Sequence, residues 1–221
     1  MKSELNSSIF AIEGVAESGK TTFIRRLDRD IFGVVSEIFD TIDVPRYNPD
    51  ENSQRLESDL WFLNVETQRW RLAAELRNAM RFRAIVMDRC VISQLVHMRA
   101  RFDVYGQKTS RAMLDALQIN FQNCTISIPS HVFIFRSLFE PRTLSLDPYQ
   151  GKAFLARVDE LYASLASSLS GMNDVSHLRD SRSEELTDRV LDAIRSPIDP
   201  ISLDHMMDAL DLTSCVVRET A

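Results

Sequence analysis

Eight residues near the start of the chain restrict its fold more than any other stretch. Residues 14–21 read G-V-A-E-S-G-K-T and match the phosphate-binding loop pattern G-x-x-x-x-G-K-[ST] at every fixed position. The apolar run at residues 8–12 predicts a buried strand before the loop, and residues 22–27 predict the first turns of a helix after it. A strand, a glycine loop and a helix in this order surround a polyphosphate with backbone N–H groups and the positive end of a helix. We therefore expect a nucleotide-binding site here.

Seven residues of this stretch are expected to contact ATP. The glycines allow backbone N–H groups to face the phosphates, Lys20 bridges the outer phosphates, and the hydroxyl of Thr21 coordinates Mg²⁺. The predicted ATP-binding residues are Gly14, Glu17, Ser18, Gly19, Lys20, Thr21 and Thr22. The competing interpretation is a chance match in a turn rich in glycine and serine, and the flanking strand and helix argue against it.

Beyond the loop, short apolar strands alternate with helical patterns. Further strands are predicted at residues 33–38, 84–87, 131–135 and 175–178, and helices at residues 56–80, 111–122, 148–169 and 184–194. Another helix follows Asp88-Arg89, a loop covers residues 102–109, and Ser110 is placed to cap the helix that begins at Arg111. Such alternation predicts parallel βαβ units and a three-layer α/β domain.

Two of the predicted strands end in charged residues. Glu37 lies near the carboxyl end of the second strand, and Asp88 and Arg89 follow the third. Ligands of parallel sheets bind at the carboxyl ends of the strands, so these residues are expected on one rim with the phosphate loop. Asp88 is then a Mg²⁺ ligand, directly or through water, or alternatively the N-cap of the next helix. Arg89 is expected to meet an acceptor oxygen or phosphate, and a structural ion pair is the other interpretation.

Composition narrows the functional classes. The 221 residues carry a formal net charge of −6, which argues against an open surface for a nucleic-acid polymer. The three cysteines, Cys90, Cys124 and Cys215, lie far apart and lack zinc or disulfide spacing, which favours a reducing location. No apolar run is long enough to span a membrane, and the first residues lack the apolar core of a signal peptide. We expect a cytoplasmic protein that binds neither a nucleic-acid polymer nor a membrane.

Three segments, in order, resemble kinases of nucleotides and nucleosides. Residues 10–15 and 18–22 look like the opening of thymidylate kinases. Residues 86–93 resemble the Asp-Arg motif of the same family and the Glu-Arg-Ser motif of deoxynucleoside kinases, and residues 154–162 are similar to the helix that follows the lid in thymidylate kinases. The resemblance implies a P-loop NTPase fold with a five-stranded parallel sheet, ATP with Mg²⁺ as the donor, and a nucleoside or nucleotide acceptor.

The resemblance also implies an acceptor site and a lid. The acceptor-binding residues that it suggests are Phe62, Arg69, Trp70 and Arg89. For Arg69 the alternative is an i,i+3 ion pair with Glu66, and for Trp70 it is an ordinary core position. Arg142 is the only basic residue inside the lid loop, at about residues 137–151, and is either an arginine finger or a solvated charge. Thymidylate kinases usually carry several arginines in this loop.

The predicted function is transfer of the γ-phosphoryl group of ATP to a (deoxy)nucleoside monophosphate. The kinase domain is expected to cover residues 1–196, and residues 197–221 form a C-terminal extension to which the sequence assigns no role. The predicted catalytic residues are Lys20, Asp88, Arg89, Glu37 and Arg142, and the predicted metal ligands are Thr21 and Asp88. The alternatives are a deoxynucleoside kinase, in which Glu37 takes the proton of a 5′-hydroxyl, and a degenerate regulator that binds nucleotide without an acceptor. The sequence leaves a homodimer open.

Overall fold

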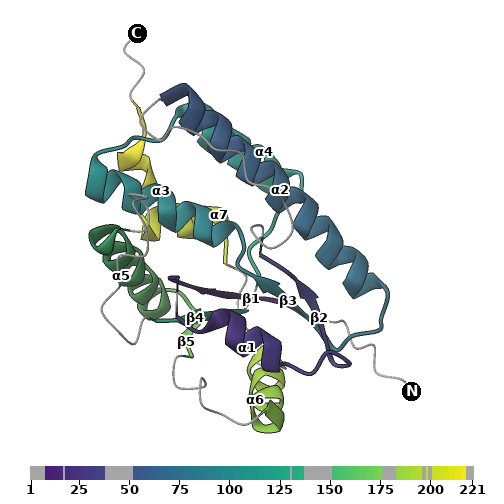
Figure 1. Cartoon of the computed structure of the whole chain (residues 1–221). Coiled ribbons are helices and arrows are strands. Elements are labelled where there is room, and N and C mark those ends of the chain that lie inside the picture. Colours follow the sequence, from purple (N-terminus) through teal and green to yellow (C-terminus); the bar gives the residue numbers. More distant parts are fainter. Residues whose placement is uncertain are drawn as a thin grey trace.

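The computed structural model describes residues 8–16, 18–37, 52–129, 131–136, 151–175, 183–195, 198 and 201–217. Its strands are β1 (Ser8–Gly14), β2 (Phe32–Val35), β3 (Ala84–Asp88), β4 (His131–Phe135) and β5 (Met172–Asp174). Its helices are α1 (Lys20–Arg26), α2 (Asn52–Asn78), α3 (Val91–Tyr105), α4 (Arg111–Gln122), α5 (Lys152–Ser168), α6 (Ser183–Arg195), α7 (Leu203–Ala209) and the short 3₁₀ helix η4 (Leu212–Cys215). Figure 1 shows the sheet in the centre with helices on both sides.

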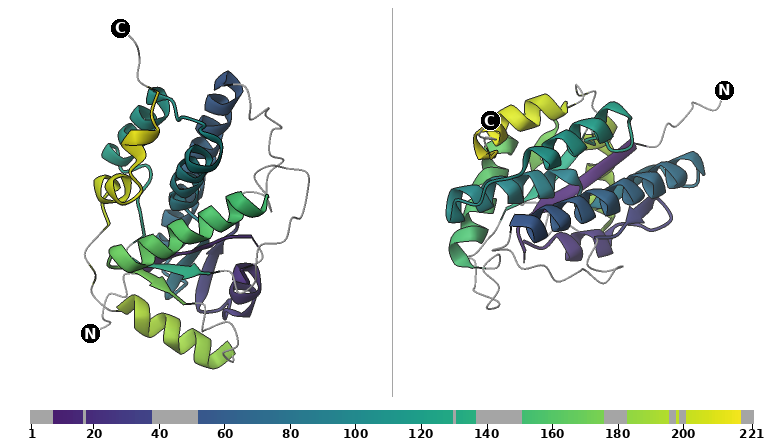
Figure 2. Two further views of the ribbon diagram at one scale, coloured as in Figure 1. Left: turned by 90° about the vertical axis from the view of Figure 1, so that its left-hand side faces the viewer. Right: turned by 90° about the horizontal axis from the view of Figure 1, so that it is seen from above.

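The five strands form one parallel sheet in the order β2-β3-β1-β4-β5. Because side chains alternate across a strand, each strand feeds two cores. Phe10 and Ile12 of β1 pack in a smaller cluster with α1 and α6, whereas Ala11 packs in a larger cluster with the other helices. The two further views show the helices on opposite faces of the sheet (Figure 2). This is the three-layer α/β fold with a five-stranded parallel sheet that the sequence predicted.

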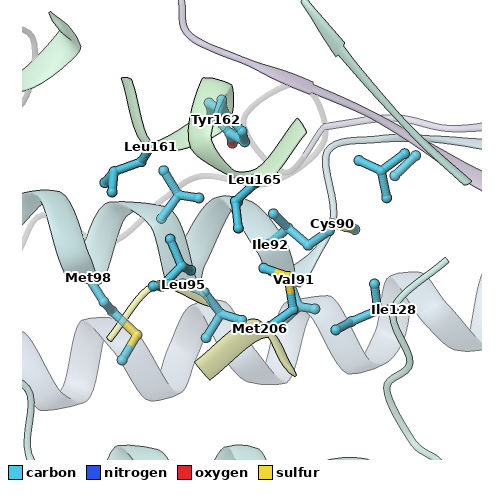
Figure 3. Close-up of a cluster of buried hydrophobic side chains, with 14 of the residues drawn as sticks. Cys90, Val91, Ile92, Leu95, Met98, Ile128, Leu161, Tyr162, Leu165 and Met206 are labelled. Atoms are coloured by element: carbon cyan, nitrogen blue, oxygen red, sulfur yellow. The ribbon is translucent and has the colours of Figure 1, made fainter. Parts of the chain in front are cut away.

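Helix α3 is the main support of the larger core. Figure 3 shows Ile92 and Leu95 of α3 close to Leu165 of α5 and to Met206 of α7. Both α3 residues are completely buried. Because the helix is packed along most of its length, the residues just before it are attached to a rigid element.

Several boundaries match the sequence prediction. Helix α4 and strand β4 begin and end at the predicted residues, and the Ser110 hydroxyl accepts a hydrogen bond from the Met113 backbone N–H at 3.2 Å. The prediction of a loop from residue 102 is wrong, because α3 continues to Tyr105 and ends at Gly106 in the left-handed conformation. The predicted helix at residues 148–169 is present as α5 from Lys152, and residues 148–150 lie outside the described residues.

The predicted position of the fifth strand is wrong. It covers Met172–Asp174 instead of residues 175–178, of which only Val175 is described. An edge strand pairs on one side, and only Met172 of this strand is buried, so it lacks the continuous apolar run of a central strand. Strand β2 also ends earlier than predicted, at Val35, which places Glu37 two residues beyond it.

The described C-terminal residues belong to the larger core. Met206, Met207 and Leu210 are buried there, and Thr109 forms a parallel bridge with Val216. The segment predicted as an extension therefore packs on α3 and on the connection between α3 and α4. Among the described residues, no helix combines the length and the apolar character that a membrane span requires.

Candidate active site

The phosphate loop has a backbone that only glycine tolerates at its first position. Gly14 has a φ of +135°, and a Cβ atom there would lie 2.1 Å from the backbone oxygen of Phe135 in β4. Gly19 also has a positive φ, 93°, and occupies the N-cap position of α1. The loop therefore passes close to β4 and leads directly into the helix, as the sequence pattern requires. Glu17 lies outside the described residues.

Lys20 is enclosed by this loop. Its side chain is buried, and Nζ donates a hydrogen bond to the backbone oxygen of Val15 at 2.7 Å. Burial lowers the pKa of Lys20 to about 7, and the positive charge of Arg89 acts in the same direction. The Ser18 hydroxyl is buried without a hydrogen-bond partner, whereas Thr21 and Thr22 are exposed on the first turn of α1.

Asp88 ends β3 beside the loop. Its side chain is buried, its Oδ1 atom has no hydrogen-bond partner, and its pKa is raised to about 6 by burial and then by the negative charge of Glu37. The N-cap of α3 is Cys90 and not Asp88, so the capping interpretation of Asp88 is not supported. A buried carboxylate oxygen without a partner is costly, and a ligand at this position would relieve that cost.

Arg89 and Glu37 form an ion pair on the same rim. Arg89 Nε lies 2.5 Å from Glu37 Oε1, and Arg89 Nη1 donates to the Ser93 hydroxyl at 3.2 Å. Burial lowers the pKa of Arg89, but the negative charges around it, of which that of Glu37 has the largest effect, together raise the pKa above its usual value. Arg89 also has a φ of +64°, which is unfavourable for a residue with a large side chain. The structure thus brings together Lys20, Asp88 and this ion pair.

Arg69 holds the neighbouring backbone. Its Nη1 donates to Glu66 Oε2 at 2.6 Å, which is the i,i+3 pair given as the alternative interpretation of Arg69, although this pair is buried. Its Nε donates to the Ser36 carbonyl at 3.1 Å, and its Nη2 to the carbonyls of Asp88 at 2.6 Å and Arg89 at 3.0 Å. All three nitrogen atoms are therefore engaged within the protein. The acceptor contact predicted for Arg69 stays a prediction, and these contacts favour a supporting role.

Glu13 was not among the site residues predicted from the sequence. This completely buried carboxylate accepts hydrogen bonds from the Cys90 backbone N–H at 2.8 Å, the Ser93 hydroxyl at 2.6 Å and the Tyr162 hydroxyl at 2.8 Å. It therefore links β1, the start of α3 and α5. The available signal was an acidic residue within the apolar run that precedes the glycine loop, because a buried charge requires several partners.

The remaining predicted site residues are Phe62 and Trp70 of the proposed acceptor site and Arg142 of the lid. Phe62 and Trp70 are both half-buried. The centroid of the Phe62 ring lies 5.0 Å from that of Trp61. Trp70 packs against the larger core, and its indole Nε1 atom is buried without a hydrogen-bond partner. Arg142 lies outside the described residues, as does nearly all of the predicted lid. The described residues contain no group of three or more His, Cys, Asp or Glu side chains that could hold a metal ion.

Comparisons with known proteins agree with this fold. No protein-family model and no curated sequence matches the chain. Among solved structures, deoxyadenosine kinase from M. mycoides, with dCMP and dCDP bound, matches with a TM-score of 0.56 at 13% identity over 86% of this chain and 100% of that one. Thymidylate kinase from Candida albicans matches with a TM-score of 0.50 at 14% identity over 89% of this chain and 99% of that one. The fold is therefore that of the thymidylate and deoxynucleoside kinases, as predicted.

Proposed function

We propose that the chain is an ATP-dependent kinase that transfers the γ-phosphoryl group to a nucleoside or a nucleoside monophosphate. The observation that carries this proposal is the environment of Lys20, which lies in the phosphate loop close enough to Glu37, Asp88 and Arg89 for their charges to affect its pKa. Phosphoryl transfer needs a cation on the outer phosphates, a metal ligand and a group that orients the acceptor. These residues supply each of the three.

The residues also fit a Mg²⁺ ion that arrives with ATP. Mg²⁺ retains several waters and is bound by one or two protein oxygens together with phosphates, so a dense cluster of ligands is not required. The unpartnered Oδ1 of Asp88 and the exposed hydroxyl of Thr21 are the two oxygens that would hold it. When bound, Mg²⁺ neutralises charge on the phosphates.

The described charges favour an uncharged acceptor. Arg89 contributes one positive charge and Lys20, with a pKa of about 7, a partial one, while the carboxylates that influence Lys20, those of Glu13, Glu37 and Asp88, contribute three negative charges. A dianionic phosphate would be repelled by this excess, whereas a 5′-hydroxyl would not. We therefore place the deoxynucleoside kinase activity first. In it the hydroxyl oxygen forms a bond to the γ-phosphorus, the bond to ADP breaks, and Glu37 takes the hydroxyl proton.

The thymidylate-kinase-like activity is the second candidate. It is supported by the resemblance of residues 10–15 and 154–162 to thymidylate kinases and by Arg142, whose charge would offset the negative excess. In that reaction the attacking phosphate oxygen is already deprotonated, so Glu37 is not needed as a base.

A substrate screen tests both candidates. The protein would be incubated with ATP, Mg²⁺ and individual nucleosides or nucleoside monophosphates, and each product identified by its mass. Phosphorylated nucleosides would support the first candidate, and nucleoside diphosphates the second. ATP binding with no phosphorylated product from any acceptor would contradict both and favour the regulator.

A further inference from the structure

The backbone at Arg89 is held in a conformation that its own sequence disfavours. Its φ of +64° lies in the left-handed region, which residues other than glycine rarely adopt. Such conformations persist only where surrounding contacts enforce them, and they gather at functional sites. Because the backbone conformation sets the direction of the side chain, the contacts that hold the Arg89 backbone also determine where its guanidinium lies.

The carbonyl groups of this segment are held from one side by Arg69. Its Nη2 binds the carbonyls of both Asp88 and Arg89, while its Nε binds the carbonyl of Ser36, the residue before Glu37. One guanidinium thus joins the chain beyond β2 to the end of β3. These two segments carry the two partners of the Glu37–Arg89 ion pair.

The N–H groups are held from the other side. The Arg89 N–H donates to the Ile12 carbonyl at 2.9 Å, and the Cys90 N–H donates to Glu13 at 2.8 Å. Glu13 also accepts from the Ser93 hydroxyl, which in turn accepts from Arg89 Nη1. The backbone and the guanidinium of Arg89 are therefore both connected to β1, the strand that leads into the phosphate loop.

We propose that Arg69, supported by Glu66, and Glu13 are positioning residues that together hold Arg89 in its left-handed conformation and set its distance from Glu37. This inference rests on the proposed function for its effect on catalysis, but the structural part does not depend on any activity. The ion pair of Arg69 with Glu66 is almost completely buried, so its geometry is fixed by the packing of α2.

The test compares three variants by amide hydrogen exchange. The double variant Glu66→Leu/Arg69→Met removes both buried charges, so neither is left unpaired and the chain is expected to fold. Exchange of the Arg89 and Cys90 amides should accelerate by at least about tenfold, because their hydrogen bonds are no longer enforced. Glu13→Gln should accelerate Cys90 more than Arg89. In the matched control Arg99→Met, whose loss leaves Asp103 paired with Arg157, both amides should exchange as in the unmodified protein.

Kinetics separate positioning from general structural support. Arg69→Lys keeps a charge beside Glu66, but an ammonium group cannot bridge several carbonyls as a guanidinium does. We expect kcat to fall by at least about tenfold while KM for ATP changes by less than about twofold. Unchanged exchange at Arg89 and Cys90 in the double variant would overturn the inference. An unmodified protein that binds ATP but phosphorylates nothing would instead overturn the proposed function, because the exchange result would still stand.

Discussion

Two arginines bind backbone carbonyl groups beside helix α3, one just before its first residue and one from its second half, and they differ in what they hold. Arg69 binds the carbonyls of Asp88, Arg89 and Ser36 on the rim with the phosphate loop. Arg99 binds the carbonyls of Leu210 and Asp211 in the C-terminal segment at 3.0 and 2.9 Å. The chemistry is the same in both places.

The surroundings of the two arginines are different. Arg69 pairs with Glu66, and the exposed fractions of the two side chains are 9% and 4%. Arg99 pairs with Asp103, at exposed fractions of 16% and 17%, and with Asp211, whose side chain is 62% exposed. Buried charges must keep their partners, whereas water can replace a partner at the surface. We infer that substitutions around Arg69 strongly lower activity or stability, whereas those around Arg99 are tolerated. Four predictions examine this difference.

The largest expected effect is on turnover, at the rim with the phosphate loop. Lys20→Ala should lower phosphoryl transfer by roughly 10³-fold or more, the range found when a cation on the transferred phosphate is removed. Stability should not fall, since the substitution also removes a buried charge. Turnover and thermal unfolding would be measured on one sample, with Arg99→Ala as the control. Full activity in a folded Lys20→Ala protein would contradict the assignment of the phosphate loop.

The second prediction concerns Glu37 and the acceptor. With a nucleoside substrate, Glu37→Gln should lower kcat by roughly 10²–10⁴-fold, because a positioned base is lost. With a nucleoside monophosphate the decrease should be smaller than that caused by Arg89→Ala. Steady-state kinetics with both types of substrate would measure these decreases in kcat. A small decrease with a nucleoside, no larger than that with a nucleoside monophosphate, would show that Glu37 serves only the ion pair with Arg89.

The third prediction compares the two arginines directly. Arg69→Ala leaves the carboxylate of Glu66 buried and unpaired, so it should lower the free energy of unfolding by about 3–5 kcal/mol. Arg99→Ala should cost only about 1 kcal/mol, since Asp103 keeps Arg157 at 2.7 Å and Asp211 is exposed to water. Urea unfolding of both variants measures this difference. Equal losses of stability would remove the distinction between the two arginines.

The sequence was sufficient for the parts of this site that depend on local spacing. Lys20 and Gly14 follow from a loop pattern of fixed length, and Asp88 follows from an apolar strand that ends in an acid. These features are set by neighbouring residues, and the glycine requirement at Gly14 is visible as a close approach to Phe135. The fold class follows in the same way from alternating strands and helices.

The contacts that support the site could not be derived in this way. Glu13 meets Ser93 and Tyr162 across 80 and 149 residues of sequence, and Arg69 meets Asp88 across 19. Such pairings are decided by how α2, α3 and α5 pack on the sheet, which leaves no periodic pattern in the sequence. The misplaced fifth strand has a related cause, because an edge strand with one buried residue resembles a loop.

The smallest expected effect is the pH dependence of nucleotide binding, which should depend on Lys20 in α1 and not on Arg99 in α3. In the free protein Lys20 has a pKa of about 7, below its usual value of 10.5, so it is mostly neutral above pH 7. Bound phosphate favours the protonated form, so binding must take up a proton and affinity must fall as pH rises.

Between pH 7.5 and 9 this dependence should arise from Lys20. Asp88, with a pKa of about 6, is already ionised throughout the range, as are the phosphates of ADP. The affinity for Mg²⁺-free ADP should therefore decrease by roughly twentyfold over this interval, as measured by titration calorimetry. Lys20→Arg, which stays charged, should abolish the dependence, and Arg99→Met should leave it unchanged. If the affinity of the unmodified protein for ADP is constant across the interval, Lys20 keeps its proton up to pH 9. Burial would then not lower the pKa of Lys20 to about 7, and this prediction would be wrong.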